Sequence, residues 1–137
     1  MFFISIRALT NIVLARLIEI NFSNSVVDLF PNIYYKILIV IILVPVVETF
    51  MYFYLPYVVL FFFLKNNKII LHIAFIISSS LLFSLDHKYH VSYFINSLVA
   101  GLLYSGLYLI YSRKEMNPFL CTLFLHSFYN LIVLLNN

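Results

Sequence analysis

The sequence predicts an all-α polytopic membrane protein. Of its 137 residues, 64% are hydrophobic and only 9% are charged, and the mean hydropathy is +1.06. Soluble domains are closer to half apolar, with about a quarter of their residues charged. Short polar stretches divide most of the chain into four apolar segments, each near the roughly 20-residue length that a helix needs to cross a bilayer. We expect one membrane domain over residues 1–137.

The first 32 residues are less regular than the rest. Residues 1–20 are apolar but contain Arg7, Arg16 and Glu19, and they lack the clean apolar middle and small-residue cleavage site of a signal peptide. We expect this segment to form an interfacial helix or a poorly hydrophobic span. Residues 21–32 are rich in Ser and Asn and predict a loop.

The four apolar segments form the predicted four-helix core, within residues 33–137. They comprise residues 34–64, 69–86, 91–111 and 118–135. The first contains Pro45 and Pro56, and each proline removes a backbone donor and tends to kink a helix. In the third, Gly101, Ser105 and Gly106 are small residues that should allow close helix packing.

The charge pattern predicts the surroundings and the orientation of the core. The loops at 65–68 and 112–115 carry four Lys or Arg residues, against Lys36 and Lys88 on the other side. Because positive loops stay in the cytoplasm, we expect these two loops to be cytoplasmic, in a multi-pass protein of the plasma membrane. The lipid bilayer is then one partner. The net charge of +3 is too small and dispersed to indicate a nucleic-acid partner.

Glu48 is the only charged residue in the apolar run from 37 to 64. A carboxylate at membrane depth is costly, so it normally faces a protein interior or a wet cavity and has a partner. A structural role, bonded to backbone groups freed by Pro45, is the simpler alternative. The sequence therefore predicts that other polar side chains meet Glu48.

His126 and Asn130 are the best candidates for these partners. They lie four residues apart and so share one face of a helix. Glu48 and His126 each lie about eleven residues from the same membrane surface, which places both roughly 16 Å deep. His87 is nearer that surface and reaches Glu48 only if its helix tilts, runs shallow, or is followed by a loop that folds inward.

Simpler readings exist for these residues too. His126 and Asn130 could serve only as hydrogen-bonding residues between helices, and residues 86–88 could form a solvated loop.

Three short motifs occur in order along these segments. Together they resemble the pattern of the CAAX protease and bacteriocin-processing (CPBP or Abi) family of intramembrane glutamate-dependent endopeptidases. That family has Pro-x-x-Glu-Glu-x-x-x-Arg on one helix, Phe-x-x-x-His at the end of another, and His-x-x-x-Asn on a later one. The matching residues here are Pro45 and Glu48, Phe83 and His87, and His126 and Asn130. Thr49 and Phe53 stand where the family's second Glu and its Arg are usual.

The resemblance implies a catalytic role for each matched residue. Glu48 would be the general base that activates water, with His87 holding the water or moving protons. His126 and Asn130 would donate hydrogen bonds to the oxyanion. No cofactor is then required, although Glu48, His87 and His126 could alternatively bind zinc. A shared site requires the Glu48 carboxylate to lie roughly 3–5 Å from both histidines.

Three functions follow from these residues. The first is hydrolysis of a peptide bond in a membrane-associated, prenylated or precursor peptide. The second is a catalytically altered or inactive relative that acts in bacteriocin self-immunity or as a membrane scaffold, because Thr49 and Phe53 depart from the motif. The third is proton-relaying transport through Glu48. It ranks last because the sequence lacks an inverted repeat.

Overall fold

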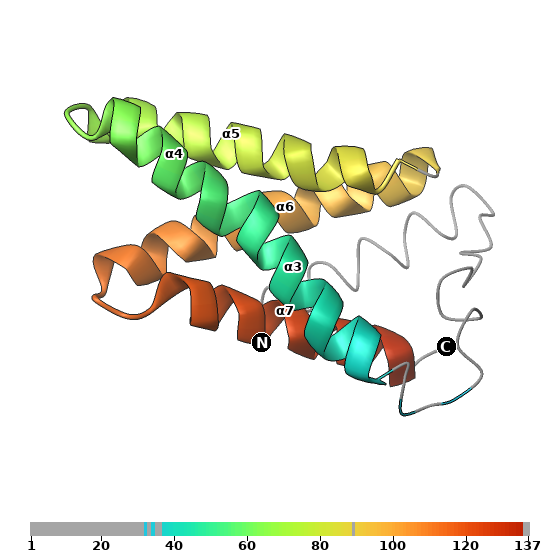
Figure 1. The fold of residues 1–137 in the computed structure, drawn as a ribbon. Coiled ribbons are helices and arrows are strands. Elements are labelled where there is room, and N and C mark those ends of the chain that lie inside the picture. The colour runs from blue at the N-terminus through green and yellow to red at the C-terminus, as the bar shows by residue number, and fades with distance from the viewer. Residues whose placement is uncertain (1–31, 33, 35–36, 89, 136–137) are drawn as a thin grey trace.

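The four apolar segments form four long helices in a computed structural model, which describes residues 32, 34, 37–88 and 90–135 (Figure 1). These described residues contain no strand. The first helix consists of η2 (Ile37–Leu43), α3 (Val44–Thr49), η3 (Phe50–Tyr54) and α4 (Leu55–Leu64). It is followed by α5 (Lys68–Asp86), α6 (Val91–Arg113) and α7 (Pro118–Leu135). All four are long and apolar enough to cross a membrane.

The all-α polytopic prediction is therefore confirmed. The expectations for the N-terminal helix and for nearly all of the loop after it concern residues 1–31, which lie outside the described part of the chain.

The two prolines of the first helix change its winding. The segments η2 and η3 are π-helical, and each is followed by an α-helical segment whose second residue is proline, Pro45 in α3 and Pro56 in α4. Proline has no N–H, and its ring crowds the carbonyl four residues earlier. The wider π turn, which pairs residues five apart, relieves that crowding while the helix continues. Glu48 lies in the short α3 segment between the two widened stretches.

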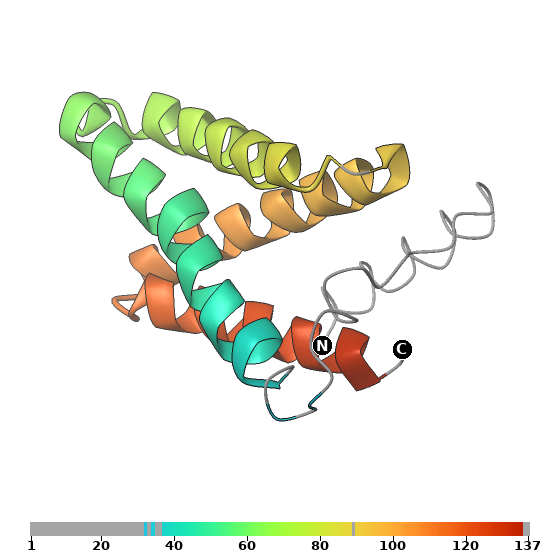
Figure 2. The same cartoon turned by 45° about the vertical axis from the view of Figure 1, so that its right-hand side comes forward.

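The first helix crosses between two partners. Its start, η2 and α3, packs against α7, and α4 packs along α5. Figures 1 and 2 show the first helix running obliquely between α7 and the α5–α6 pair. This crossing brings the middle of the first helix close to both α5 and α7.

The interior is more polar than the outer surface. Aromatic rings form its centre, with Phe53, Phe75 and Phe83 almost fully buried. Around them lie buried hydroxyl, amide and imidazole side chains, whereas many large aliphatic and aromatic side chains are exposed. Lipid is as apolar as leucine, so polar and small residues belong between helices and apolar ones outside. This distribution of buried polar and exposed apolar side chains is the one expected in a lipid bilayer.

Close packing of α5 on α6 depends on one glycine. A Cβ atom at Gly101 would lie 2.8 Å from the Cα of Ser80, and the hydroxyls of Ser80 and Ser105 lie 3.5 Å apart. The expectation of small-residue packing is thus right for Gly101 and Ser105. It is wrong for Gly106, where a Cβ would meet nothing within 4 Å, because this residue does not face a neighbouring helix closely.

We predict that Gly101→Ala destabilises the protein by about 1–3 kcal/mol, because the added methyl group meets backbone of α5 and forces α5 and α6 apart. Gly106→Ala is the matched control on the same helix, where alanine favours the helix and should be neutral or stabilising. Thermal unfolding of the purified protein in detergent measures both. Equal losses at the two positions would contradict this account of the α5–α6 contact.

Candidate active site

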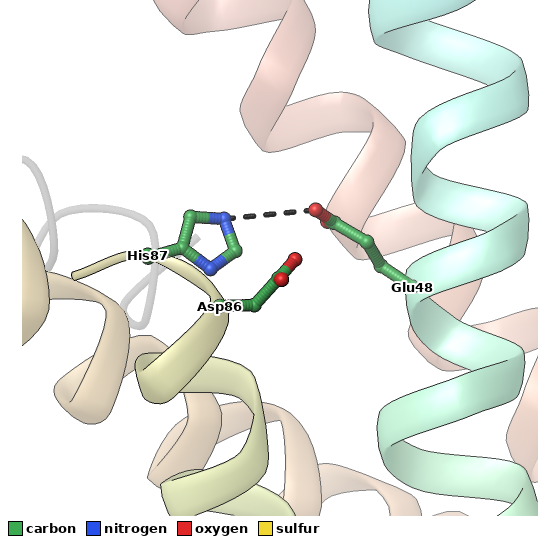
Figure 3. A group of neighbouring side chains, drawn as sticks. All are labelled: Glu48, Asp86 and His87. Carbon is green, nitrogen blue, oxygen red and sulfur yellow. Dashed lines mark ion pairs between the residues drawn. The ribbon is translucent and has the colours of Figure 1, made fainter. Parts of the chain in front are cut away.

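Glu48 points from α3 toward the end of α5, where His87 and Asp86 face it (Figure 3). Its side chain is only 14% exposed. The crossing of the first helix accounts for this position, because α3 packs on α7 while η3 contacts α5. Glu48 therefore turns inward and not toward lipid, as its cost at membrane depth requires.

His126 of α7 contacts one oxygen of this carboxylate. Its Nε2 lies 3.1 Å from Glu48 Oε2, and its side chain is 2% exposed. The ring packs against Tyr104 and Phe83, at centroid distances of 5.0 and 5.7 Å. Behind the ring, the hydroxyl of Thr49 lies 3.5 Å from Nδ1. His126 is thus held on its faces and at both nitrogens.

His87 contacts the other oxygen. Its Nε2 lies 3.6 Å from Glu48 Oε1. The chain leaves α5 at Asp86, and the ring of His87 folds back so that Nδ1 lies 2.7 Å from the carbonyl oxygen of Phe83. The ring also packs on those of Phe83 and Tyr93. His87 is therefore half-buried and faces the site, whereas Asp86 and Lys88 beside it are exposed.

The structure brings together three of the four residues singled out from the sequence. Glu48, His87 and His126 come from three different helices or their ends, and the two distances of 3.6 and 3.1 Å lie in the expected range. The inward fold of the chain after α5 is what allows His87 to join.

Asn130 makes a different contact. Its amide donates to the carbonyl oxygen of Val40 at 3.0 Å. In a π-helical register this carbonyl would accept from the backbone of residue 45, which is proline and has no N–H. One N–H of Asn130 thus satisfies a backbone group beside a proline. This is the interhelical hydrogen bond that the sequence analysis gave as an alternative role for Asn130. The amide has a second N–H donor besides the one directed at Val40.

Asp86 is a neighbour of the site that the sequence motifs did not single out as functional. Ligand atoms of Glu48, Asp86 and His87 all lie within 4.8 Å of one another (Figure 3). Carboxylate and imidazole groups at this spacing are able to bind a divalent cation. This set differs from the zinc set Glu48, His87 and His126, because it replaces His126 with Asp86. The position of Asp86 next to His87 in the sequence could have indicated that Asp86 lies near the site.

An open recess adjoins these residues on the side of α5. Its volume is about 670 Å³. Tyr52 enters it from η3, one helical turn after Glu48, and packs edge-on against Phe83. The recess is lined by Tyr52, Leu82, Leu85, Asp86 and Lys88.

One family model matches most of the chain. The model describes type II CAAX prenyl endopeptidases of the Rce1-like group and covers residues 30–132 of the 137. The chain belongs to the Rce1-like family. The CAAX protease and bacteriocin-processing resemblance is thereby confirmed, and with four apolar helices the chain is an integral membrane protein of a protease family. No curated protein and no solved structure matches it.

The two residues that depart from the motif given in the sequence analysis are both fully buried. Thr49 and Phe53 are each 0% exposed. Thr49 contacts the imidazole of His126, and Phe53 packs on Phe83 and Tyr104 at centroid distances of 5.7 and 5.8 Å. A hydroxyl and an apolar ring thus stand where the motif in the sequence analysis has Glu and Arg, and neither leaves an uncompensated buried charge.

We predict that Asn130→Leu lowers stability by about 1 kcal/mol, because the Val40 carbonyl loses its donor. The measurement is the thermal unfolding midpoint in detergent, with Ser127→Ala on the same helix as the control. An unchanged midpoint in Asn130→Leu would show that the contact with Val40 contributes nothing to the fold.

Proposed function

We propose that this protein is an intramembrane endopeptidase of the plasma membrane, in which Glu48 activates a water molecule to hydrolyse a peptide bond. The substrate is a membrane-associated peptide, and prenylated peptides are the first to test because the family is named for them. The observation that carries the proposal is the approach of Glu48 Oε1 and His87 Nε2 to 3.6 Å in a mostly buried site.

The hydrogen bond behind His87 makes this pair informative. The carbonyl of Phe83 can only accept, so Nδ1 of His87 carries the proton that bridges their 2.7 Å contact. With its single ring proton on Nδ1, His87 presents the Nε2 lone pair to the Glu48 carboxylate, which is also an acceptor. Two acceptors at this separation are stabilised by a donor between them. A water molecule that donates one proton to each keeps its own lone pair for attack.

Hydrolysis then proceeds in two balanced steps. The water oxygen bonds to the carbonyl carbon, the C=O π electrons move to the carbonyl oxygen, and Glu48 Oε1 takes the proton that water loses. The C–N bond then breaks, the oxyanion electrons return to the C=O bond, and the proton passes from Glu48 to the departing amine. Water supplies the hydroxyl of the new carboxylic acid, so no other reactant is needed.

Both His126 and Asn130 were expected to donate to the oxyanion, but Nε2 of His126 already faces Glu48 Oε2 at 3.1 Å. Asn130 is therefore the proposed oxyanion donor. The Nε2 of His126 lies next to the carboxylate, and Asn130 follows one turn later on α7. Fixed donors in a site with little water stabilise a developing oxyanion most strongly. The second N–H of the Asn130 amide is the one proposed for this task, since the first is directed at Val40.

The recess beside Tyr52 offers a path for the substrate. Leu82 and Leu85 lie on the exposed face of α5 with Asp86. A lipid-anchored peptide moving in the bilayer would meet these apolar side chains before the carboxylate of Glu48. This supports a substrate that enters sideways from the membrane.

Thr49 and Phe53 favour one competing function. If the altered motif has ended hydrolysis, the same site would bind a peptide or partner protein in self-immunity or as a scaffold. In this alternative, binding does not depend on the proton-accepting chemistry of the Glu48 carboxylate.

We predict that Glu48→Gln lowers kcat for a lipid-anchored peptide by about 100- to 10,000-fold, because the amide cannot take a proton from water. Cleavage is followed by mass spectrometry of the protein reconstituted in liposomes. The matched control is Glu115→Gln, in the exposed turn after α6, and it should cleave at the wild-type rate.

The competing function gives the opposite result. Retained peptide binding without cleavage in the wild type, and no effect of Glu48→Gln on that binding, would replace hydrolysis with the immunity or scaffold role.

A chelator distinguishes the water mechanism from the zinc alternative. Each histidine faces its own oxygen of Glu48. A water molecule that donates to both Glu48 and His87 fits the proposed mechanism without a cation. We therefore predict that 1,10-phenanthroline leaves the cleavage rate unchanged. Inhibition that added Zn²⁺ reverses would instead support a metal at Glu48, with His87 and either Asp86 or His126.

A further inference from the structure

We infer that Thr49 sets the tautomer of His126, so that the two site histidines hold opposite tautomers. His87 carries its proton on Nδ1 and His126 carries its proton on Nε2. The two oxygens of Glu48 then differ, since Oε2 accepts from His126 and Oε1 faces a lone pair. The catalytic consequence rests on the proposed function, whereas the tautomers rest on the contacts alone.

The state of His126 follows from what each nitrogen faces. Nε2 lies 3.1 Å from Glu48 Oε2, and an ionised carboxylate can only accept. A proton on Nε2 forms a charge-assisted hydrogen bond, which is about twice as strong as a neutral one. A bare Nε2 would instead set two lone pairs against each other at 3.1 Å. The proton therefore belongs on Nε2.

Thr49 is the residue that makes this state self-consistent. With the proton on Nε2, Nδ1 is an acceptor, and the Thr49 hydroxyl 3.5 Å away is able to donate to it. The hydroxyl is buried at 0% exposure, so this contact is not open to exchange with bulk water. A carboxylate at position 49 could only accept and would draw a proton onto Nδ1.

The aromatic residues around the ring limit its other options. Tyr104 packs at an interplanar angle of 33° and Phe83 packs edge-on at 81°. Phe53 packs against both of these rings. This packing keeps the imidazole from turning away from Thr49 and Glu48. Thr49 is thus a positioning residue that acts on Glu48 through His126.

The consequence is a directional site. The line of hydrogen bonds runs from the Thr49 hydroxyl to Nδ1 of His126, and from Nε2 to Glu48 Oε2. Because Oε2 already accepts this proton, Oε1 is the basic oxygen toward the water proposed between Glu48 and His87. The oxygen that takes the proton is therefore fixed before substrate binds.

The test is nitrogen NMR of the full chain, labelled with ¹⁵N-histidine, in bilayer nanodiscs at neutral pH. The chain has four histidines, so His87→Gln and His126→Gln assign the two site residues by the loss of their signals. We expect a protonated Nδ1 and a bare Nε2 for His87, and the reverse for His126. A protonated Nδ1 in wild-type His126 would overturn the inference.

Two variants test Thr49 itself. Thr49→Val keeps the shape but removes the hydroxyl, so the Nδ1 resonance of His126 should shift. Thr49→Ser keeps the hydroxyl and should leave that resonance at the wild-type position. If the Thr49→Val protein folds and its His126 Nδ1 resonance matches that of the wild type, the hydroxyl does not donate to the ring.

Kinetics then separate this inference from the proposed function. We expect Thr49→Val to lower kcat about five- to tenfold with KM unchanged, the loss of about one hydrogen bond, and Thr49→Ser to restore most of it. An unaltered kcat in a cleaving Thr49→Val enzyme would overturn the positioning role. If neither the wild type nor any variant cleaves the peptide but the expected tautomers are present, the proposed hydrolysis is rejected. The inference about the tautomers is then still supported.

Discussion

The contact of one buried carboxylate with two imidazoles is the constraint on which the rest of this structure depends. Glu48 lies in a helix whose other side chains are almost all apolar and partly exposed. Such an acid is tolerated only where protein surrounds it with polar partners. The oblique crossing of the first helix supplies them, since it places α3 against α7 and η3 against α5. His126 and His87 then approach separate oxygens of one carboxylate.

The surroundings of this contact are built without additional charge. Where the family motif usually has an acid and a base, this chain has Thr49 and Phe53, both fully buried. Replacing a buried ion pair with well-packed apolar groups is often neutral or stabilising. The aromatic cluster of Phe53, Phe83 and Tyr104 orders the imidazole of His126 by packing, and Thr49 orders it by a hydroxyl contact. In this chain, ring packing and one hydroxyl contact position the imidazole of His126.

Helix geometry explains why much of this was predictable from the sequence. Apolar length alone located the four spans, because the bilayer requires it. The rise per residue placed Glu48 and His126 at one depth, and two motif residues four apart share a helix face. Family membership followed from three short motifs in order. Each of these inferences uses a regular periodicity.

Irregular backbone explains what the sequence did not predict. The inward fold of His87 depends on the turn after Asp86, where the regular helix has ended. The prolines produce π-helical winding. Asn130 then donates a hydrogen bond to the carbonyl oxygen of Val40. Gly106 shares a helix with Gly101 but not its contact, since only the helix crossing decides which glycine is needed. The proximity of Asp86 to Glu48 likewise depends on the end of α5.

The most direct test of the account is a nuclear distance measurement in the membrane. Glu carboxyl carbons are labelled with ¹³C and His nitrogens with ¹⁵N, and rotational-echo double resonance reports the pairs that lie close together. Glu48 should couple strongly to Nε2 of both His87 and His126, and His87→Gln or His126→Gln should each remove one coupling. A Glu48 carboxyl carbon without coupling to either ring would contradict the shared site, and with it the proposed chemistry.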